Sequence, residues 1–512
     1  MGENMAERCL RDLFEKSFLT QGKRRAIRFL RDGSVETLMP YDALDRDSNR
    51  MARTFLEKGV RKGDRVILYL DKCLAFVVAH LALQKIGAVS VPLNPGFKKS
   101  EMAYFIQDAE AALILAGPAQ ASLLEDIDPS LNRMVCDPQA PYQALHFFRN
   151  APEDLPREDI GPEDVGLIIY TSGTTGRPKG AMLTQKNLVR DALNIISIWE
   201  ISPSDMLCHA LPLFHVHGLC FALHTALGAG AGMTMLDAFK ADRVLDVLAG
   251  KDGESACSIF MAVPAMYGKM MDAMSEKTYD FKHMRLWTSG SAPLLVKDFK
   301  RIKDRFGKEP VEREGMSETG MNFSNPLRGR KKPGSIGKPL PGLRVRMVNP
   351  ETHRDVAPGQ TGEFWLKGPA VTPGYWRKPK ETEAAFEEGW FKTGDLGRVD
   401  QDGYYYLTDR IKHIIISGGE NISPKEIEGV LNRFDDVAES CVVGLPDDQW
   451  GERVVAAVVG KPGFHMDVDQ LRQACREHLH DWKCPKAFRF VDALPKNAMG
   501  KVLKEEVKAL FH

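Results

Sequence analysis

The sequence lacks most of the features that mark a secreted or nucleic-acid-binding protein. Nine cysteines are scattered through 512 residues and none forms a CxxC pair, which argues against a disulfide framework and a zinc ribbon. The N-terminal segment contains no apolar run of the kind found in a signal peptide. The 69 Lys and Arg equal the 69 Asp and Glu, so no overall basic charge is available to bind nucleic acid. We therefore expect a cytoplasmic protein with no nucleic-acid partner.

Long hydrophobic runs are also scarce. The one long stretch without Asp, Glu, Lys or Arg spans residues 206–236, and it contains four histidines, four glycines and a proline. This composition favours a buried helix with its loops, so we expect no membrane span. With 43% hydrophobic and 27% charged residues the chain is expected to be globular, and its length suffices for roughly two to four domains.

Strand-like and helical patterns alternate through the first three quarters of the chain. Apolar strands are expected at 65–70 and 88–93, with a helical stretch at 73–86 between them. A further buried strand at 165–170 follows an acidic linker at 153–164. This alternation is typical of βαβ units, so the sequence predicts an α/β fold with mostly parallel sheets.

The pattern changes twice near the C-terminus. From residue 343, short strands with close turns predict a small β-rich subdomain over 343–410. A compact α+β pattern follows, and its length suffices for a separate domain. We therefore expect a large N-terminal domain over 1–410 and a small C-terminal domain over 411–512.

The strongest local signal is the segment TSGTTGRPKG at residues 171–180, directly after the predicted strand. Its small residues let the backbone bend, its hydroxyl and N–H groups can line a phosphate chain, and Lys179 adds positive charge. The spacing differs from that of a Walker A loop. The segment therefore predicts a phosphate-binding turn of another kind.

Three further segments offer groups that suit a nucleotide. Glu318 in EGMSET is an oxygen ligand suited to Mg²⁺. Asp395 in TGDL places a carboxylate at a strand end, where it can bind the two hydroxyls of a ribose. Lys501, which follows Gly500 in PKNAMGK, lies in a loop long enough to reach a site on another domain.

Taken in this order and spacing, these segments resemble the adenylate-forming superfamily of acyl-CoA synthetases, adenylation domains and luciferases. The resemblance covers nearly the whole chain and is densest in YTSGTTGRPKGAMLT, PLFHVHG, SGSAPL, GMSETG, GWFKTGDLG, DRIKHIIISGGENISPKEIE and PKNAMGK. Within the superfamily the chain resembles malonyl-CoA synthetases most, through HVHG, LWTSGSAPLL, GMSETGMNFSNP and KNAMGKV.

The resemblance implies two half-reactions. A carboxylate attacks ATP to give acyl-AMP and pyrophosphate, and the thiol of coenzyme A then releases acyl-CoA and AMP. The N-terminal domain is expected to bind ATP, Mg²⁺ and the acid. The C-terminal domain is expected to act as a lid that rotates between the two steps about a hinge at Lys412.

Motif positions also imply a role for each site residue. The phosphates are assigned to Thr171, Ser172, Gly173, Thr174, Thr175, Gly176 and Lys179, and Mg²⁺ to Glu318 and Thr171. The adenine is assigned to Ser291, Ala292, Pro293, Glu314, Gly315, Met316 and Ser317, and the ribose to Asp395 and Arg410. The acid is assigned to His215, Val216, Lys269 and Met316, and coenzyme A to Ser417, Gly418 and Gly419. Lys501, Glu318 and His215 are the expected catalytic residues.

The chemistry agrees with these roles. A carboxylate is already a nucleophile at neutral pH, so adenylation needs positioning and charge neutralisation and no general base. Lys501, Lys179 and Mg²⁺ would supply the charge. An adenylate hydrolyses readily, which gives a reason for a closing lid.

Two residues depart from the family pattern. Glu314 stands where the superfamily usually has an aromatic residue that stacks on adenine, and a glutamate can only accept a hydrogen bond there. Lys269 stands where malonyl-CoA synthetases carry an arginine, and a lysine pairs with a distal carboxylate only as a point charge. A solvent-facing lysine on a helix is the alternative for Lys269.

Three other patterns have simpler explanations than a further site. His215 and His217 could bind zinc, but no third ligand is near in sequence. The run of tyrosines at 404–406 fits strand packing better than base stacking. The basic segment at 328–332 fits a solvated loop or a contact with nucleotide phosphates.

We therefore predict an ATP-dependent acyl-CoA synthetase whose acid is malonate or a similar compound. A medium-chain fatty acyl-CoA synthetase and a stand-alone adenylation enzyme that loads a carrier protein are alternatives within the superfamily. A nucleotide-binding homologue that has lost catalysis, suggested by Glu314, is the alternative from another class. A homodimer is compatible with these properties.

Overall fold

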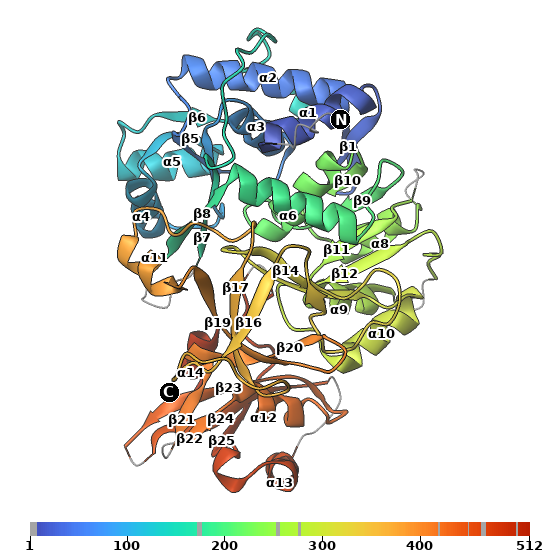
Figure 1. The fold of residues 1–512 in the computed structure, drawn as a ribbon. Coiled ribbons are helices and arrows are strands. Elements are labelled where there is room, and N and C mark those ends of the chain that lie inside the picture. Colours follow the sequence, from blue (N-terminus) through green and yellow to red (C-terminus); the bar gives the residue numbers. More distant parts are fainter. Residues whose placement is uncertain are drawn as a thin grey trace, which may run out of the picture. The chain divides into compact units, whose positions relative to one another are not determined.

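The protein has a mixed α/β fold, which confirms the predicted fold class (Figure 1). The computed structural model describes residues 8–171, 177–251, 256–274, 278–417, 420–448, 450–461, 467–497 and 500–511. The chain divides into two compact units. The first comprises Met1–Arg344 and Leu366–Phe391, and the second comprises Val345–Trp365 and Lys392–His512. This division differs from the expected boundary at residues 410–411, which stays a prediction.

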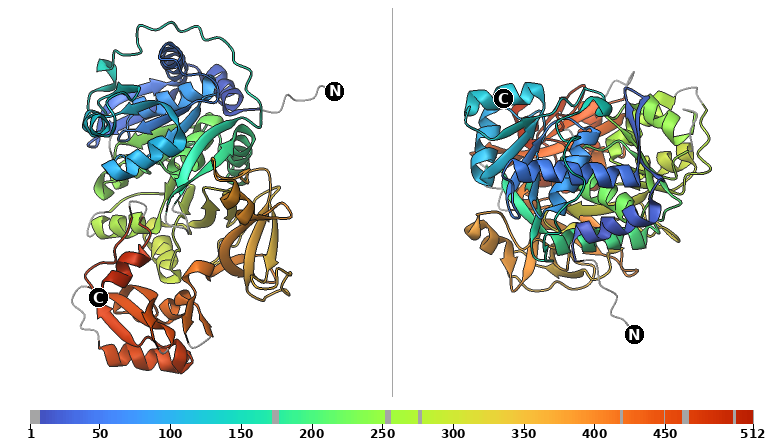
Figure 2. Two further views of the ribbon diagram at one scale, coloured as in Figure 1. Left: turned by 90° about the vertical axis from the view of Figure 1, so that its left-hand side faces the viewer. Right: turned by 90° about the horizontal axis from the view of Figure 1, so that it is seen from above.

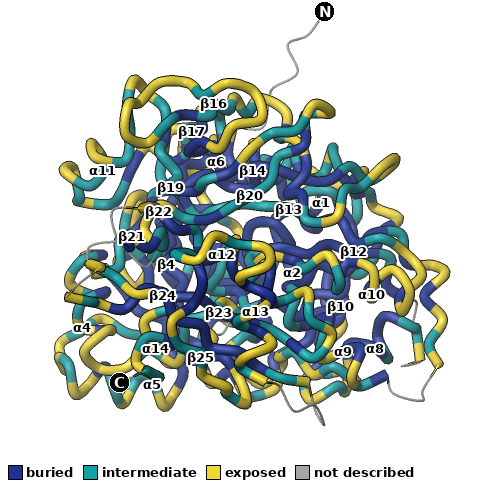
Figure 3. The backbone as a smooth tube through the Cα atoms, turned by 90° about the horizontal axis from the view of Figure 1, so that it is seen from below, coloured by how far each residue is buried: buried dark blue, intermediate teal, exposed yellow. Residues whose placement is uncertain are grey.

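A nine-stranded sheet forms one half of the first unit. Its inner strands are parallel, while β2, β14 and β15 at its two edges pair antiparallel. The strand order is β15 (Lys338–Pro339), β14 (Gly320–Ser324), β13 (Val311–Met316), β12 (Leu286–Ser289), β11 (Ile259–Ala262), β9 (Met206–His209), β10 (Gly232–Leu236), β1 (Arg25–Arg31) and β2 (Ser34–Pro40). The inner strands β10 and β12 are buried along their length, as their dark tubes show in Figure 3.

A six-stranded sheet forms the other half. The order is β6 (Arg133–Val135), β5 (Ala111–Ala116), β3 (Arg65–Tyr69), β4 (Val89–Pro92), β7 (Val165–Thr171) and β8 (Lys179–Thr184). All neighbours are parallel except β7 and β8, which form an antiparallel pair. These strands begin and end close to the ranges expected at 65–70, 88–93 and 165–170.

Helices cover the two sheets of the first unit (Figure 2). They are α1 (Leu10–Gln21), α2 (Tyr41–Glu57), α3 (Leu74–Lys85), α4 (Lys99–Ala109), α5 (Pro118–Ile127), α6 (Gln185–Ile198), α7 (Thr225–Gly228), α8 (Ala241–Leu248), α9 (Pro264–Met274), α10 (Val296–Phe306) and α11 (Pro379–Ala385). Every residue of α3 is buried, and the helix is accordingly apolar apart from His80, Gln84 and Lys85. In contrast, α10 buries only Phe299, Ile302 and Phe306, one stripe at helical spacing, and ends at Gly307 in the left-handed conformation.

The apolar stretch at 206–236 contains a π-helix, η2 (His217–His224), which continues into α7. Among the described residues, no helix is long and apolar enough to cross a bilayer. The short 3₁₀ turns are η1 (Tyr142–Ala144), η3 (Ile411–His413) and η4 (Asp481–Lys483).

The remaining strands form two small sheets. The first contains β16 (Arg344–Val348), β17 (Gly362–Lys367), β18 (Phe386–Glu387), β19 (Trp390–Val399) and β20 (Tyr405–Arg410). The second contains β21 (Ile415–Ser417), β22 (Glu420–Ile422), β23 (Val437–Asp447), β24 (Gly451–Gly460) and β25 (Ala487–Phe490). The second sheet packs with α12 (Pro424–Leu431), α13 (Val468–His478) and α14 (Lys504–Ala509), and its apolar core includes Ile427, Leu431 and Val454.

Candidate active site

A buried carboxylate lies where the glycine-rich segment leaves the six-stranded sheet. Thr171 ends β7 and pairs with Lys179, the first residue of β8. The Thr171 hydroxyl donates to Glu318 Oε1 at 3.2 Å, and the Tyr375 hydroxyl donates to the same oxygen at 3.2 Å. Glu318 is 8% exposed. Burial, together with the charge of Glu318, raises the pKa of Tyr375, so its hydroxyl keeps its proton.

These groups also suit a cation and a phosphate chain. The ammonium of Lys179 lies 5.3 Å from the centre of the Tyr375 ring, whose hydroxyl donates to Glu318. A carboxylate oxygen and a neighbouring hydroxyl are ligands that Mg²⁺ accepts. The chemistry of the donor set therefore fits the predicted metal. The other predicted phosphate-binding residues lie outside the described residues; they are Ser172, Gly173, Thr174, Thr175 and Gly176.

A histidine pair joins the start of η2 to the turn after β12. The backbone N–H of His217 donates to Nδ1 of His215 at 3.2 Å. Nδ1 of His217 lies 3.1 Å from the hydroxyl of Ser291. Burial, and next the charge of Arg313, lowers the pKa of His217, so its imidazole is neutral. The structure thus joins the expected acid-site histidine to the expected adenine turn.

The turn that carries Ser291 has an unusual backbone. Ser291 has a φ of 65°, a left-handed conformation that L-residues adopt at some energetic cost. Ala292 is partly buried and Pro293 is exposed in the same turn. Across from it, Gly315 lies so close to Gly320 that a Cβ would come within 2.6 Å of the carbonyl oxygen. Only glycine fits at this point of β13.

A second histidine fixes the position at which η2 begins. His209, at the end of β9, accepts a hydrogen bond from the Lys72 ammonium at Nδ1 over 3.0 Å. Its Nε2–H therefore donates to the Gly218 carbonyl at 2.9 Å. A Cβ on Gly218 would lie 2.0 Å from the carbonyl oxygen of Pro212. The chain can make this close approach only with glycine.

Arg313 is a buried cation that the sequence analysis did not identify. It is 2% exposed, and its guanidinium lies 4.9 Å from the centre of the Phe221 ring. Its Nε and Nη2 atoms have no hydrogen-bond partner among the described residues. Burial lowers its pKa to about 10, so the group remains charged at neutral pH. Buried N–H groups of this kind are normally paired, which makes Arg313 a candidate binder of an anion.

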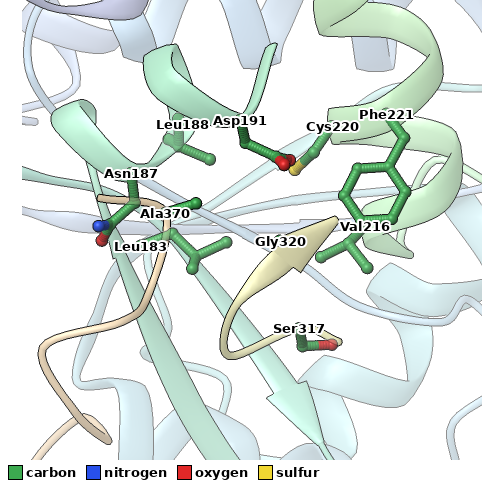
Figure 4. Close-up of a pocket in the computed structure, with 10 residues that line it drawn as sticks. All are labelled: Leu183, Asn187, Leu188, Asp191, Val216, Cys220, Phe221, Ser317, Gly320 and Ala370. Carbon is green, nitrogen blue, oxygen red and sulfur yellow. The ribbon is translucent and has the colours of Figure 1, made fainter. Parts of the chain in front are cut away.

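A small cavity is lined in part by Phe221, the ring that the Arg313 guanidinium contacts (Figure 4). Its volume is about 10 Å³, on the order of the space that one water molecule occupies. The lining residues are Leu183, Asn187, Leu188, Asp191, Val216, Cys220, Phe221, Ser317, Gly320 and Ala370. Two of the predicted site residues, Val216 and Ser317, thus lie on the same cavity.

Asp191 is the charged residue of this cavity, and its carboxyl group points towards the sulfur of Cys220 (Figure 4). One carboxyl oxygen accepts a hydrogen bond from the backbone N–H of Met321 at 2.9 Å. Burial raises the pKa of Asp191 to about 7, although the Met321 bond and the charge of Arg313 act in the opposite direction.

The two residues that depart from the family pattern lie in different surroundings. The amide of Asn322 donates to Glu314 Oε2 at 3.1 Å, which holds the carboxylate to its own hairpin. Lys269 lies on the exposed side of α9, and the buried side of that helix carries Met266, Tyr267 and Met270. Met316, the last residue of β13, is partly buried.

In the second unit, the expected ribose pair is brought together by strand pairing. Asp395 and Arg410 are directly opposite each other on β19 and β20. Arg410 Nε lies 2.6 Å from Asp395 Oδ1, and Nη2 donates to Oδ2 at 3.3 Å. The Asp395 backbone N–H donates to the Thr393 hydroxyl at 3.0 Å. This two-point contact orients the buried carboxylate.

Lys412, the expected hinge, and Lys501, the expected catalytic lysine, both affect the pKa of His413. The pKa of His413 in η3 is lowered to about 3 by burial, and then by the charges of Lys504, Lys412, Arg410 and Lys501. Lys412 and Lys501 are both at least partly exposed. Four cationic side chains of the second unit thus act on one neutral imidazole.

The expected coenzyme A turn lies partly outside the described residues. Ser417 is buried at the end of β21 and pairs with Glu420, whereas Gly418 and Gly419 lie outside the described residues. Among the described residues, no group of three or more His, Cys, Asp and Glu side chains is arranged to hold a metal ion.

Two family models match the chain. The model of the AMP-binding enzymes matches residues 14–376, and that of the AMP-binding enzyme C-terminal domain matches residues 426–501. A mitochondrial malonate–CoA ligase of Bos taurus is 35% identical over 482 residues, covering 88% of this chain and 82% of the relative. An oxalate–CoA ligase of Arabidopsis thaliana is 33% identical over 483 residues, covering 92% of each. The crystal structure of ATP-bound MatB from Rhodopseudomonas palustris matches with a TM-score of 0.91 at 35% identity, covering 98% of this chain and 99% of that chain.

Proposed function

The chain belongs to the AMP-binding enzyme family as an AMP-forming acyl-CoA ligase, an acid–thiol ligase, and we propose that its acid substrate is malonate. Relatives and a structural neighbour support this choice, since the Bos taurus protein is named a malonate–CoA ligase and its identity extends over most of both chains. Malonate differs from a fatty acid in carrying a second carboxylate.

The two N–H groups of Arg313 that lack a hydrogen-bond partner among the described residues, Nε and Nη2, are the observation that carries the proposal. Buried N–H groups without an acceptor are costly, and a carboxylate that accepts from both of them would remove this cost. A monocarboxylic acyl chain would leave these two N–H groups without an acceptor and would bind less well. A short diacid is therefore the acid that the Arg313 guanidinium favours.

The first half-reaction is assigned to residues of the first unit. The acid carboxylate attacks the α-phosphorus of ATP and pyrophosphate leaves, so the protein has to hold the two reactants in line and neutralise charge. Glu318 and Thr171 would hold Mg²⁺, which would neutralise part of the triphosphate charge. Lys179 would bind the phosphates, and His215 would close the wall beside the acid carboxylate.

The second half-reaction is assigned to a lid that moves about Lys412. Asp395 and Arg410 would bind the ribose hydroxyls, and Ser417, Gly418 and Gly419 would line the path of the coenzyme A thiol. Lys501 would serve adenylation only. Separate positions for the two steps would protect the acyl-AMP from water until the thiol arrives.

Acid-dependent exchange between ATP and labelled pyrophosphate tests the proposal. We expect exchange with malonate, weaker exchange with acetate or octanoate, and AMP release only when coenzyme A is added. Stronger exchange with octanoate would support a medium-chain fatty acyl-CoA synthetase instead. AMP release with a carrier protein in place of coenzyme A would support an adenylation enzyme. If no acid supported exchange, a nucleotide-binding protein without catalysis would be the better description.

We also propose that the enzyme acts in the cytoplasm. All nine cysteines are buried free thiols, which suits a reducing compartment. Cell fractionation with antibodies to the protein tests the location, and recovery in a secreted or organelle fraction would contradict it. A homodimer stays a prediction for which mass measurement in solution is the test.

A further inference from the structure

Two side chains of α4 contact the chain on both sides of residues 172–176. The Tyr104 hydroxyl donates to the Pro178 carbonyl at 2.6 Å, immediately before Lys179. The Tyr170 hydroxyl donates to Asp108 Oδ2 at 2.8 Å, immediately before Thr171. Tyr104 and Asp108 are four residues apart, so they lie on one face of the helix. One helix face therefore holds both ends of the predicted phosphate-binding segment.

The second oxygen of Asp108 extends this contact to a third segment. Asp108 Oδ1 lies 2.8 Å from the Lys378 ammonium, and the Asp108 side chain is only 6% exposed. The indole N–H of Trp376 donates to the Asp108 carbonyl at 3.1 Å. These residues follow Tyr375, whose hydroxyl donates to Glu318. Asp108 thus connects the two ends of the segment to the stretch of chain that positions Glu318.

Packing and charge support the same arrangement. Phe105, on the turn between Tyr104 and Asp108, packs edge-on against the Tyr170 ring with 4.7 Å between ring centres. The hydrogen bond with Asp108 raises the pKa of Lys378, so the ammonium keeps its charge. Burial, and then the Asp108 bond, raises the pKa of Tyr170, so the phenol stays a donor. The donors around the Asp108 carboxyl group are therefore fixed at neutral pH.

We propose that Asp108 is a positioning residue for the phosphates of ATP. It touches no reacting atom. It acts through Tyr170 on Thr171, through Lys378 on the segment beside Glu318, and together with Tyr104 on Lys179. This inference rests on the proposed function, because it assumes that Thr171, Lys179 and Glu318 bind the triphosphate and its metal.

The test compares Asp108→Asn, Tyr170→Phe and Tyr104→Phe with a matched control. Tyr41→Phe is that control, because Tyr41 is fully buried and donates to the Ala231 carbonyl at 2.7 Å, away from these segments. We expect the three variants to raise the KM for ATP in pyrophosphate exchange roughly 5- to 50-fold, with Asp108→Asn the strongest. The KM for the acid and the rate of thioesterification from supplied acyl-AMP should stay within about twofold, because neither needs the β- and γ-phosphates.

Several outcomes would overturn the inference. One is an unchanged KM for ATP in all three variants. Another is an equal rise in Tyr41→Phe, and a third is a parallel loss of thioesterification, since both would indicate general destabilisation. Direct measurement of the Kd for ATP with Mg²⁺ separates this inference from the proposed function. If the wild type binds ATP but exchanges with no acid, the function fails, and weaker ATP binding by the variants still supports the inference.

Discussion

Buried charge distinguishes the proposed acid site at the scale of single residues. Arg313 and Asp191 are both almost fully buried, and each affects the pKa of the other. Arg313 remains protonated and its Nε and Nη2 have no partner among the described residues, while Asp191 has a raised pKa. The site therefore favours an anion at the guanidinium and opposes a second fixed negative charge nearby.

The first prediction compares Arg313→Gln with Lys269→Ala on a diacid and a monocarboxylate. Because Arg313 is buried, its loss should lower kcat/KM for malonate by roughly 10- to 100-fold, and much less for a monocarboxylate. The sequence-based expectation is that Lys269 pairs with the diacid, so that Lys269→Ala raises the KM for a diacid most. Steady-state kinetics with malonate and butyrate decide between them. An unchanged ratio of the two acids in Arg313→Gln would remove this residue from the acid site.

The second prediction concerns Asp191 and pH. The pKa of the Asp191 carboxyl is about 7 in the folded chain and about 3.9 in the unfolded chain. Its contribution to the free energy of unfolding is therefore fully present below pH 4 and is lost as the pH rises towards 7. Asp191→Asn keeps an acceptor for the Met321 N–H and removes this loss. The variant's gain in unfolding free energy should be about 2 kcal/mol larger at pH 8 than at pH 5. Denaturant titrations at the two pH values test this, and a gain independent of pH would contradict it.

Sequence reasoning reached some of these residues and missed others for identifiable reasons. Thr171 and Glu318 stand in motifs whose spacing is characteristic, and the structure joins them by a hydrogen bond. Arg313 carries no such signal, because a sequence does not reveal whether a guanidinium in a strand is paired. The sequence left a solvent-facing position open for Lys269, and the structure places this lysine on the exposed side of α9, while Met266, Tyr267 and Met270 form its apolar stripe.

At the scale of elements, the alternation of strands and helices was predictable and the π-helix was not. Apolar runs flanked by turn residues indicate parallel strands, and the structure has strands at Arg65–Tyr69 and Val89–Pro92. The apolar stretch at 206–236 indicated only a buried helix. The wider turns of η2 (His217–His224) accompany a close approach between Gly218 and Pro212, which local propensity does not encode.

The third prediction tests this close approach. Gly218→Ala places a Cβ about 2 Å from the Pro212 carbonyl, so the start of η2 has to move. We expect the melting temperature of this variant to fall on the order of 5–10 °C, with loss of acid-dependent exchange. Gly268→Ala is the matched control, because a Cβ there meets no atom within 4 Å in the middle of α9 and favours the helix. Equal melting temperatures in the two variants would contradict the steric argument.

At the scale of the whole molecule, the main expectation is that two units carry different parts of the reaction. The two family models match separate stretches of the chain, residues 14–376 and 426–501. The change from short strands to a compact α+β pattern predicts two domains that divide at residues 410–411, and this boundary stays a prediction. The boundary itself was harder to predict, since Gly362–Lys367 and Trp390–Val399 are strands within which the compact units divide.

The fourth prediction separates the two half-reactions. Lys501→Ala should abolish nearly all pyrophosphate exchange, since the ammonium is assigned to the charge of the adenylation step. Thioesterification of supplied acyl-AMP should persist near the wild-type rate. Lys496→Ala is a useful control, because Lys496 lies in the same C-terminal segment and its ammonium pairs with Glu439. Equal loss of both half-reactions in Lys501→Ala would contradict the assignment to a lid.

The two hydroxyls that donate to Glu318 affect how quickly a cation could bind there. Thr171 and Tyr375 both donate to the same oxygen, Oε1, and neither bond is shorter than 3.2 Å. A hydroxyl hydrogen turns about its C–O bond without displacing a heavy atom, and such rotations take nanoseconds or less. An arriving cation can therefore replace these donors without a change of rotamer at Glu318. If Mg²⁺ binds here as proposed, rearrangement of the Glu318 carboxylate is therefore not expected to limit turnover.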